Sequence, residues 1–433
     1  MSNYKFLVPI AMVVLFFVSG YMLLDARASV VEKYEITLEA ARDYREQDIR
    51  VDAQAQYLSA YSQMPSAELA MEISEFYEKS YNKGQAIGWL ETAINTHNED
   101  VFLYEELMRL YYENQDFVAC YKVFDLLQKR KLSSDYATET EEKIAYTYYF
   151  NSNFDEVVVY SEGLIPIKVK EMWGYANTTG SKVIANSFEK VGAFSDGLAP
   201  VVDNDGDAYF IDTNGNKKKV VIGVEGVKEL GLIANNMFAL YNGKSWAFYN
   251  TNNEYVFGDY EKVSSLGNGI AAVMNNYKWN LVNYNGISVT NDEYDDVIMD
   301  EKSIVYRNDR IFVMQGSMYS MIDATGNVIV KQQYQDARLF NDGSYAAVKV
   351  DGKWGFIDKD GTIVIEPQYE EARSFMNGLA AVRFGGFWGF INQEGEMVIK
   401  PAFDDAKDFN SNGCVFVLRG EQWELLRLYK YNH

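Results

Sequence analysis

Apolar and polar residues are spaced in two different ways along this chain of 433 residues. From about Val30 to Tyr160 the apolar spacing is helical and glycine is scarce, as in amphipathic helices. From Gly163 onward, short apolar runs are separated by turns rich in Asp, Asn and Gly, as in antiparallel strands. The pattern predicts a multidomain protein with a helical domain over residues 30–160 and an all-β domain over residues 163–433.

The β region repeats one pattern eight times. The clearest copies read KWGFIDKDGTIVIEPQYEEARSFMNGLAAV from Lys353 and FWGFINQEGEMVIKPAFDDAKDF from Phe387. Counted on the Trp of the Trp-Gly-Phe-Ile core, the steps are 35, 38, 33, 40, 35, 34 and 35 residues. Such a period is typical of one supersecondary unit in a stack or ring. The markers are Trp173, Ala208, Trp246, Trp279, Tyr319, Trp354, Trp388 and Trp423.

Each copy is predicted to hold about three antiparallel strands. Dipeptides such as Asp351-Gly352 accept positive φ and close two-residue hairpins. A polar connector such as Tyr369 to Phe375 ends the copy, and its aromatic residues are expected to pack against the next unit. Because such a sheet cannot bury both faces alone, the units must stack. A closed ring like a β-propeller is favoured because closure shields sheet edges, and an open β-solenoid is the alternative.

This pattern resembles the WG-repeat family, also called KWG repeats, over roughly Gly163 to Leu428. The match is specific in copies six to eight and weaker elsewhere, since Ala208 and Tyr319 replace the tryptophan and Ala247 follows Trp246. The last copy lacks a third strand. The resemblance implies that the tryptophans are structural markers of the repeat, and it implies no common activity.

The helical region contains small, aromatic and proline residues at the spacing of a tetratricopeptide repeat, which it resembles. A second and a third unit follow after 33 and 34 residues, and a fourth hairpin from about Thr138 to Tyr160 is partial. An unrelated helical bundle is the alternative. The residues that carry the first unit are Ala41, Tyr44, Ala53, Tyr57, Ala60 and Pro65.

In the tetratricopeptide family the inner helices form a groove that takes peptides. Each residue that the resemblance places there can also be read as part of a solvated face, as for Glu105 and Arg109, which are spaced as an i, i+4 pair. The resemblance implies the candidate groove residues Arg42, Arg45, Glu75, Glu78, Glu105, Arg109 and Tyr112.

The N-terminus carries an uncharged run of nineteen residues from Phe6 to Leu24. As a helix this run reaches about 28 Å, roughly one hydrocarbon thickness. The sequence predicts a transmembrane anchor over residues 6–24, with residues 1–5 cytoplasmic and the bulk of the chain extracytoplasmic. Secretion after signal cleavage near Ala28 is the first alternative, and a buried core helix is the second.

The net charge of the chain limits the kinds of partner that the protein can bind. The formal net charge of −22 argues against nucleic acid, which requires clustered Lys and Arg. Residues 25–162 carry 27 acidic and 13 basic side chains, so the helical region is the more acidic part of the chain. Cys120 and Cys414 fall in different predicted domains, and we expect no disulfide between them.

Little in the sequence indicates catalysis. The histidines are His97 and His433, which argues against imidazole catalysis and zinc sites. Asp203 to Asp207 resembles a calcium loop but coincides with a hairpin turn. The acidic pairs Glu370-Glu371, Asp404-Asp405 and Asp295-Asp296 occupy one repeated connector position. We predict no enzyme activity, no cofactor and no metal.

The function predicted from the sequence is an anchored, non-catalytic scaffold that binds proteins or peptides of the cell envelope through both repeat surfaces. A module that binds glycan or another polymer, or a sensory module, is the alternative. A glycan-cleaving enzyme using one of the acidic pairs is a third hypothesis.

Overall fold

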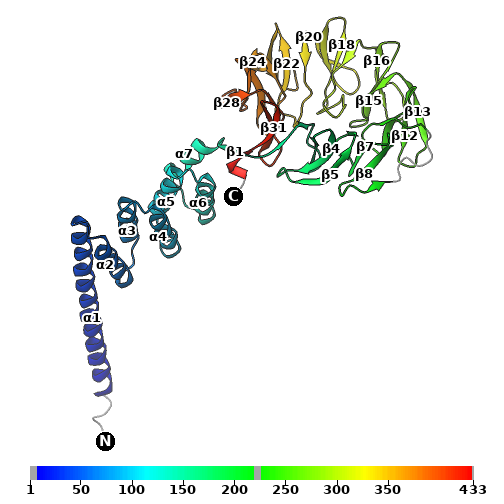
Figure 1. The fold of residues 1–433 in the computed structure, drawn as a ribbon. Coiled ribbons are helices and arrows are strands. Elements are labelled where there is room, and N and C mark those ends of the chain that lie inside the picture. Colours follow the sequence, from blue (N-terminus) through cyan, green and yellow to red (C-terminus); the bar gives the residue numbers. More distant parts are fainter. Residues whose placement is uncertain (1–6, 219–225, 432–433) are drawn as a thin grey trace. The chain divides into compact units, whose positions relative to one another are not determined.

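The computed structural model describes residues 7–218 and 226–431, with side chains described from residue 27 onward. The chain separates into two compact units, a helical one ending at Thr147 and a β unit running from Tyr148 to Tyr431 (Figure 1). Cys120 lies in the first and Cys414 in the second, and both are buried free thiols.

The helical unit contains seven helices among its described residues, and consecutive helices pack against each other (Figure 1). Short turns connect them, which favours antiparallel pairing of neighbours. The helices are α1 (Leu7–Glu46), α2 (Arg50–Gln63), α3 (Ala67–Lys79), α4 (Lys83–Thr96), α5 (Val101–Glu113), α6 (Phe117–Arg130) and α7 (Asp135–Ile144).

Small side chains occupy the interior of this helical unit. Ala41 in α1, Ala53 in α2 and Ala86 in α4 are fully buried, so the helices can approach closely. Ser66 and Asn82 begin α3 and α4 by accepting hydrogen bonds from backbone N–H groups of the first turn. Ala41 and Ala53 lie buried as the predicted repeat spacing requires, while the tetratricopeptide resemblance itself stays a prediction.

The predicted membrane anchor, residues 6–24, coincides with the first half of α1. Phe6 and the side chains of residues 7–26 lie outside the described part of the structure. Within the described part, no helix combines the length and the apolar character that a membrane span requires. The anchor therefore stays a prediction.

The helical region ends earlier than the sequence predicted. After α7 the chain forms β1 (Tyr148–Phe154), so the helical assignment from Thr138 to Tyr160 is wrong beyond Ile144. The segment reads YYFNSNF, in which aromatic and short polar residues favour a strand over a helix. The division between the units falls at Thr147 and Tyr148, not near Glu162.

The β unit contains eight antiparallel sheets among its described residues, arranged as the blades of a propeller (Figure 1). We number the blades 1 to 8 in chain order. Blades 1 to 4 consist of β2 (Glu156–Val157), β3 (Leu164–Val169), β4 (Met172–Asn177) and β5 (Lys182–Phe188); β6 (Lys190–Val191), β7 (Leu198–Val202), β8 (Ala208–Asp212) and β9 (Lys217–Lys218); β10 (Glu229–Leu230), β11 (Met237–Tyr241), β12 (Trp246–Asn250) and β13 (Tyr255–Tyr260); and β14 (Lys262–Val263), β15 (Ile270–Asn275) and β16 (Lys278–Asn283).

Blades 5 to 8 follow the same order, and a 3-10 helix at Tyr429–Tyr431 comes after the last strand. They consist of β17 (Asp296–Val297), β18 (Ile311–Gln315), β19 (Met318–Ile322) and β20 (Val328–Tyr334); β21 (Asp336–Ala337), β22 (Ala346–Val350), β23 (Lys353–Ile357) and β24 (Ile363–Tyr369); β25 (Glu371–Ala372), β26 (Ala380–Phe384), β27 (Phe387–Ile391) and β28 (Met397–Phe403); and β29 (Asp405–Ala406), β30 (Cys414–Arg419) and β31 (Gln422–Leu428), with β1 as fourth strand.

Strand β1 closes the ring. It pairs antiparallel with β31, from Tyr148 opposite Leu428 to Phe154 opposite Trp423. The fourth strand of blade 8 therefore comes from the start of the β unit, which removes a free sheet edge. The predicted ring is confirmed, and the open solenoid is excluded.

Most blades have four strands where the sequence predicted about three. The additional strand is a two-residue segment inside the predicted polar connector, which we call the opening strand. In blade 7 it is β25, where Glu371 pairs with Arg383 and Ala372 with Val382. Two residues are too few to show an alternating pattern, so the sequence did not reveal this strand.

The glycine of the Trp-Gly core is required by the neighbouring strand. A Cβ on Gly355 would lie 2.6 Å from the Ile365 carbonyl oxygen, and one on Gly389 would lie 2.5 Å from that of Ile399. In blade 3 the core reads Trp246-Ala247, and the opposing residue is Gly258, which lies against the Ala247 methyl group. In blade 3 the glycine that leaves room between the two strands therefore lies on the fourth strand of the blade, β13, opposite Ala247.

Apolar residues of consecutive blades form shared cores. Phe356 of blade 6 packs edge-on against Phe375, in the connector that leads into blade 7, at 4.9 Å between ring centroids. Phe390 and Phe409 repeat this contact one blade later at 4.8 Å. The connector aromatics thus pack between blades as predicted, so each blade depends on its neighbours.

Candidate functional site

Five of the seven candidate groove residues line one open groove in the helical unit, with a volume of about 1000 Å³. They come from alternate helices of the array, so their side chains meet on one side. Helix α1 provides Arg42 and Arg45, α3 provides Glu68, Met71, Glu72, Glu75, Glu78 and Lys79, and α5 provides Glu106 and Arg109.

The other two candidates do not line this groove. Glu105 accepts a hydrogen bond from the Ser134 hydroxyl at 2.6 Å, and the Tyr112 ring packs against Phe117 at 6.2 Å. Glu106 takes the place that the sequence assigned to Glu105. One residue turns a helix by about 100°, which is enough to move a side chain to another face.

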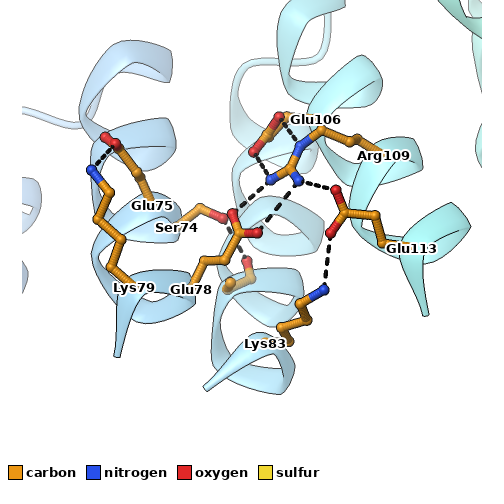
Figure 2. Close-up of polar contacts among 9 residues, drawn as sticks. Ser74, Glu75, Glu78, Lys79, Lys83, Glu106, Arg109 and Glu113 are labelled. Carbon is orange, nitrogen blue, oxygen red and sulfur yellow. Dashed lines mark hydrogen bonds and ion pairs between the residues drawn. The ribbon is translucent and has the colours of Figure 1, made fainter. Parts of the chain in front are cut away.

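Arg109 forms the centre of an ion-pair network that joins three helices (Figure 2). Its guanidinium lies 2.6 Å from Glu78 of α3 and 2.7 Å from Glu106 of α5. It also lies 2.6 Å from Glu113, which Lys83 of α4 contacts at 2.9 Å. Hydrogen bonds from Lys83 and Arg109 lower the pKa of Glu113. The predicted Glu105 to Arg109 pair is replaced by this network.

Glu72 forms the second polar centre of the groove, and it was not among the groove residues predicted from the sequence. Its carboxylate accepts hydrogen bonds from Arg42 at 2.7 and 2.9 Å and from the Tyr57 hydroxyl at 2.8 Å. Burial tends to raise the pKa of Glu72, but hydrogen bonds from Arg42 and Tyr57 outweigh it and lower that pKa. Its spacing of three residues from Glu75 was the available signal.

A second polar site lies at the centre of the propeller. From the opening strand to the next bridge residue, blade 5 runs from Asp296 to Arg307, whereas blade 7 runs from Glu371 to Met376. The segment is six residues longer in blade 5. We call residues 299–304 the axial loop.

The axial loop contacts blades on several sides of the ring. The Ser303 carbonyl accepts a hydrogen bond from the Ser265 N–H of blade 4 at 2.7 Å, and the Lys302 ammonium donates to the Ser161 hydroxyl of blade 1 at 2.8 Å. Glu301 accepts from Arg373 of blade 7 and from the Lys407 ammonium, each at 2.9 Å. A segment that reaches all these blades crosses the propeller axis.

Cations follow the opening strands of blades 6, 7 and 8 at equivalent positions. Arg338 lies over the Trp354 ring at 4.4 Å, and Lys407 lies over Trp423 at 5.3 Å. Trp354 is fully buried and Trp279 is 8 % exposed. Trp173, Trp246, Trp388 and Trp423 are partly buried. The marker tryptophans thus pack within the blades, and several of them form cation–π interactions with a basic side chain.

Two adjoining cavities of about 130 and 440 Å³ lie at the axis, and Asp300, Glu301, Asn341 and Asp408 line both. Asp408 Oδ2 accepts a hydrogen bond from the Asn341 amide at 3.1 Å. Its buried Oδ1 has no hydrogen-bond partner among the described residues. Burial raises the pKa of Asp408 to about 6, with Arg373 opposing and Glu301 adding to the effect.

The acidic motifs considered for catalysis or calcium have local structural roles. Glu370 accepts hydrogen bonds from the N–H groups of Gly385 and Gly386, each at 3.1 Å, and so holds the hairpin turn of its own blade. Asp203 Oδ1 accepts from the backbone N–H groups of Asp205 and Asp207 within its turn. Within the described ranges, no group of three His, Cys, Asp or Glu residues is arranged to hold a metal.

These features define the class of the protein as a helical array followed by an eight-bladed β-propeller. The family model described as WG containing repeat matches residues 173–206, 246–279, 319–354, 354–386 and 388–423. The β region therefore contains WG repeats, as the Trp-Gly pattern predicted.

Comparison with solved structures gives remote likenesses. The chain has no significant match among curated proteins. The crystal structure of BamB from Moraxella catarrhalis is 12% identical, covers 65% of this chain and 98% of its own, and has a TM-score of 0.42. The Pan2 WD40 domain of Neurospora crassa is 12% identical, covers 56% of this chain and 89% of its own, and has a TM-score of 0.32.

Proposed function

We propose that the protein is a non-catalytic scaffold of the cell envelope, anchored by residues 6–24, whose helical groove binds an extended segment of a partner protein. The open groove lined by nine charged side chains and Met71 is the observation that carries this proposal. Its rigid helices present these side chains in fixed positions, which lowers the ordering cost of binding.

The electrostatics of the groove favour a basic partner segment. The ion pairs of Arg42 and Arg109 hold the groove carboxylates in place, while residues 25–162 as a whole carry 27 acidic and 13 basic side chains. Such an excess attracts cations from beyond contact distance and speeds their association. Lys or Arg side chains of a partner can then contact Glu68 and Glu75 at the groove surface.

The placement outside the cytoplasm rests on the N-terminal apolar run and the charge that precedes it. Lys5 comes before nineteen uncharged residues, and Asp25 follows them. Protease added to intact cells or spheroplasts should degrade the tagged full chain while leaving cytoplasmic markers intact. Full protection from protease, with the markers intact, would contradict this placement.

Photo-crosslinking in the native cell tests the groove. A photoreactive phenylalanine analogue at Glu75 should capture a protein partner through the membrane-anchored full chain. The same analogue at Thr92, which is exposed on α4 and is not among the groove residues, is the matched control. Capture at both sites with equal yield, or at neither site, would refute peptide binding in the groove.

The alternative is a module that binds glycan through exposed aromatic residues of the propeller. Phe384 and Phe387 flank the Gly385-Gly386 turn of blade 7 and are 53% and 49% exposed. Aromatic faces of this kind can stack on sugar rings. Glycan-array binding that is lost on replacing both residues by serine would favour this function over peptide binding.

A further inference from the structure

The smaller axial cavity contains polar groups that the protein itself does not satisfy. Asp408 Oδ1 and the Tyr160 hydroxyl are buried and have no hydrogen-bond partner within the described ranges. Both residues line this cavity, and so does Lys302. Unsatisfied buried polar groups are costly, and their presence in a cavity indicates that a ligand or water completes them.

The charges around this cavity balance, but they are not all paired with each other. Its lining includes three carboxylates and three cations. Arg307 binds Asp300 at 2.6 Å, and Lys407 binds Glu301 at 2.9 Å. These two ion pairs leave Asp408 and Lys302 as the acid and the base without an ion-pair partner in the described structure.

Lys302 has donors to spare. Its ammonium carries three N–H groups and donates one to the Ser161 hydroxyl at 2.8 Å, which in turn donates to the Phe194 carbonyl. Burial lowers the pKa of Lys302, and the nearby Arg307 adds to this effect. A carboxylate ligand would offset both penalties by accepting hydrogen bonds from Lys302.

Part of the cavity wall is apolar. Ile165, Val158, Phe416 and Leu425 line the same cavity, which has a volume of about 130 Å³. At about 30 Å³ per water molecule, this space holds roughly four waters or one small organic molecule. A site with one unpaired acid, one unpaired base and an apolar wall matches a small molecule with both charges and a short side chain.

We propose that the axial cavity of the propeller binds a free α-amino acid. Its ammonium group donates to Asp408 Oδ1, and its carboxylate accepts from the Lys302 ammonium and the Tyr160 hydroxyl. Its side chain packs on the apolar wall formed by blades 1 and 8. The axial loop supplies Lys302, so the six residues inserted into blade 5 create the recognition of the carboxylate.

Calorimetric titration of the purified full chain with the twenty proteinogenic amino acids tests the proposal. At least one should bind and raise the unfolding temperature of the propeller. The corresponding amine without the carboxylate, and the acid without the ammonium, should each bind at least about 10-fold more weakly, because each loses a charge-assisted contact. No binding by any amino acid at millimolar concentration would overturn the proposal and leave a cavity filled by water.

Variants locate the site. Asp408→Asn and Lys302→Met should each weaken binding by about 10-fold or more, while Asp205→Asn, in an exposed turn of blade 2, should leave it unchanged. Equal binding by all three variants would place the ligand elsewhere and refute the site. If Lys302→Met fails to fold, the comparison of the amine and the acid on the unmodified chain still decides the question.

Discussion

The helical unit and the propeller are both built from repeated modules, but they differ in how the repetition ends. The helices form a linear array in which each helix packs mainly on its neighbours in sequence. In the propeller, blade 8 is completed by β1, which lies before the first blade in the chain. A linear array tolerates loss of an end, whereas a ring depends on a contact between its two ends.

The same difference appears in the charges of the two units. In the open groove, Glu72, Glu78 and Glu106 all have basic partners and remain in contact with solvent. At the axis, the ring encloses Asp408 with one oxygen unsatisfied. An open surface allows each carboxylate to find a partner or water, whereas closure of a ring can trap a polar group, which then becomes available to a ligand.

The largest effect should come from removing β1. A fragment of residues 148–433 should fold and unfold cooperatively, because it retains the pairing of Tyr148 with Leu428 and of Phe154 with Trp423. A fragment of residues 163–433 should fail to form stable tertiary structure, because blade 8 loses β1 and blade 1 loses β2. Circular dichroism and thermal unfolding measure both. Equal unfolding temperatures would show that closure by β1 is not needed.

The next effect concerns the glycine in the Trp-Gly core. Gly258→Ala should destabilise the propeller by about 3 kcal/mol, because the new Cβ would lie 2.4 Å from that of Ala247. Adding Ala247→Gly should recover most of this loss, since it restores the glycine to its usual strand. Denaturant unfolding measures the cycle.

Gly88→Ala in α4 is the control from the other unit, because a Cβ there meets nothing within 4 Å. It should stabilise the helical unit by up to about 1 kcal/mol. If the double variant with Gly258→Ala and Ala247→Gly were no more stable than Gly258→Ala alone, contact with the Ala247 methyl group would not explain why glycine stands at position 258.

The sequence revealed the repeat but not the closure. The Trp-Gly core and its turns recur in step, so the blades could be counted before their packing was known. Strand β1 precedes the first marker Trp173 and adjoins a helical region, and its partner β31 lies more than 250 residues away. Local pattern carries no information on such a pairing, so Tyr148 to Phe154 was assigned to the helices.

The two polar sites were predictable to different degrees. The tetratricopeptide resemblance placed Arg42, Glu78 and Arg109 on one side of the array, and it missed Glu106 by a single residue. The axial loop left only the long step from Trp279 to Tyr319 as a signal. The contacts of Glu301 and Lys302 with blades 1, 7 and 8 arise from the ring, so the sequence could not place these side chains together.

A smaller effect should come from Asp408, and it should depend on pH. Arg373, Glu301, Lys407 and Asn341 surround this carboxyl, and burial raises its pKa to about 6 from an ordinary value of 3.8. The folded state therefore binds the proton more tightly than the unfolded state between about pH 4 and 6, and stability from this group falls as pH rises through that range.

Asn resembles the protonated carboxyl, so Asp408→Asn should match the unmodified chain near pH 4 and exceed its stability by about 2 kcal/mol above pH 6. Urea unfolding at both pH values measures this. If the Asn variant were less stable than the unmodified chain at neutral pH, the ionised Asp408 carboxylate would be well accommodated at the axis. The axis would then not differ from the groove in how it holds its carboxylates.

The smallest effect should come from the groove, and its sign should be opposite. Arg109→Met leaves Glu78, Glu106 and Glu113 near one another without their shared cation, yet Arg109 is 31% exposed and its partners are 24% to 40% exposed. Exposed ion pairs contribute little, so the helical unit should lose about 1 kcal/mol, and high salt should reduce the loss because it screens the repulsion.

Lys143→Met, which removes an isolated pair with Glu139 on α7, is the matched control and should change stability by less. If Arg109→Met instead stabilised the unit as Asp408→Asn is expected to stabilise the propeller, the groove charges would also be held against their preference, and the difference between the open array and the closed ring would disappear.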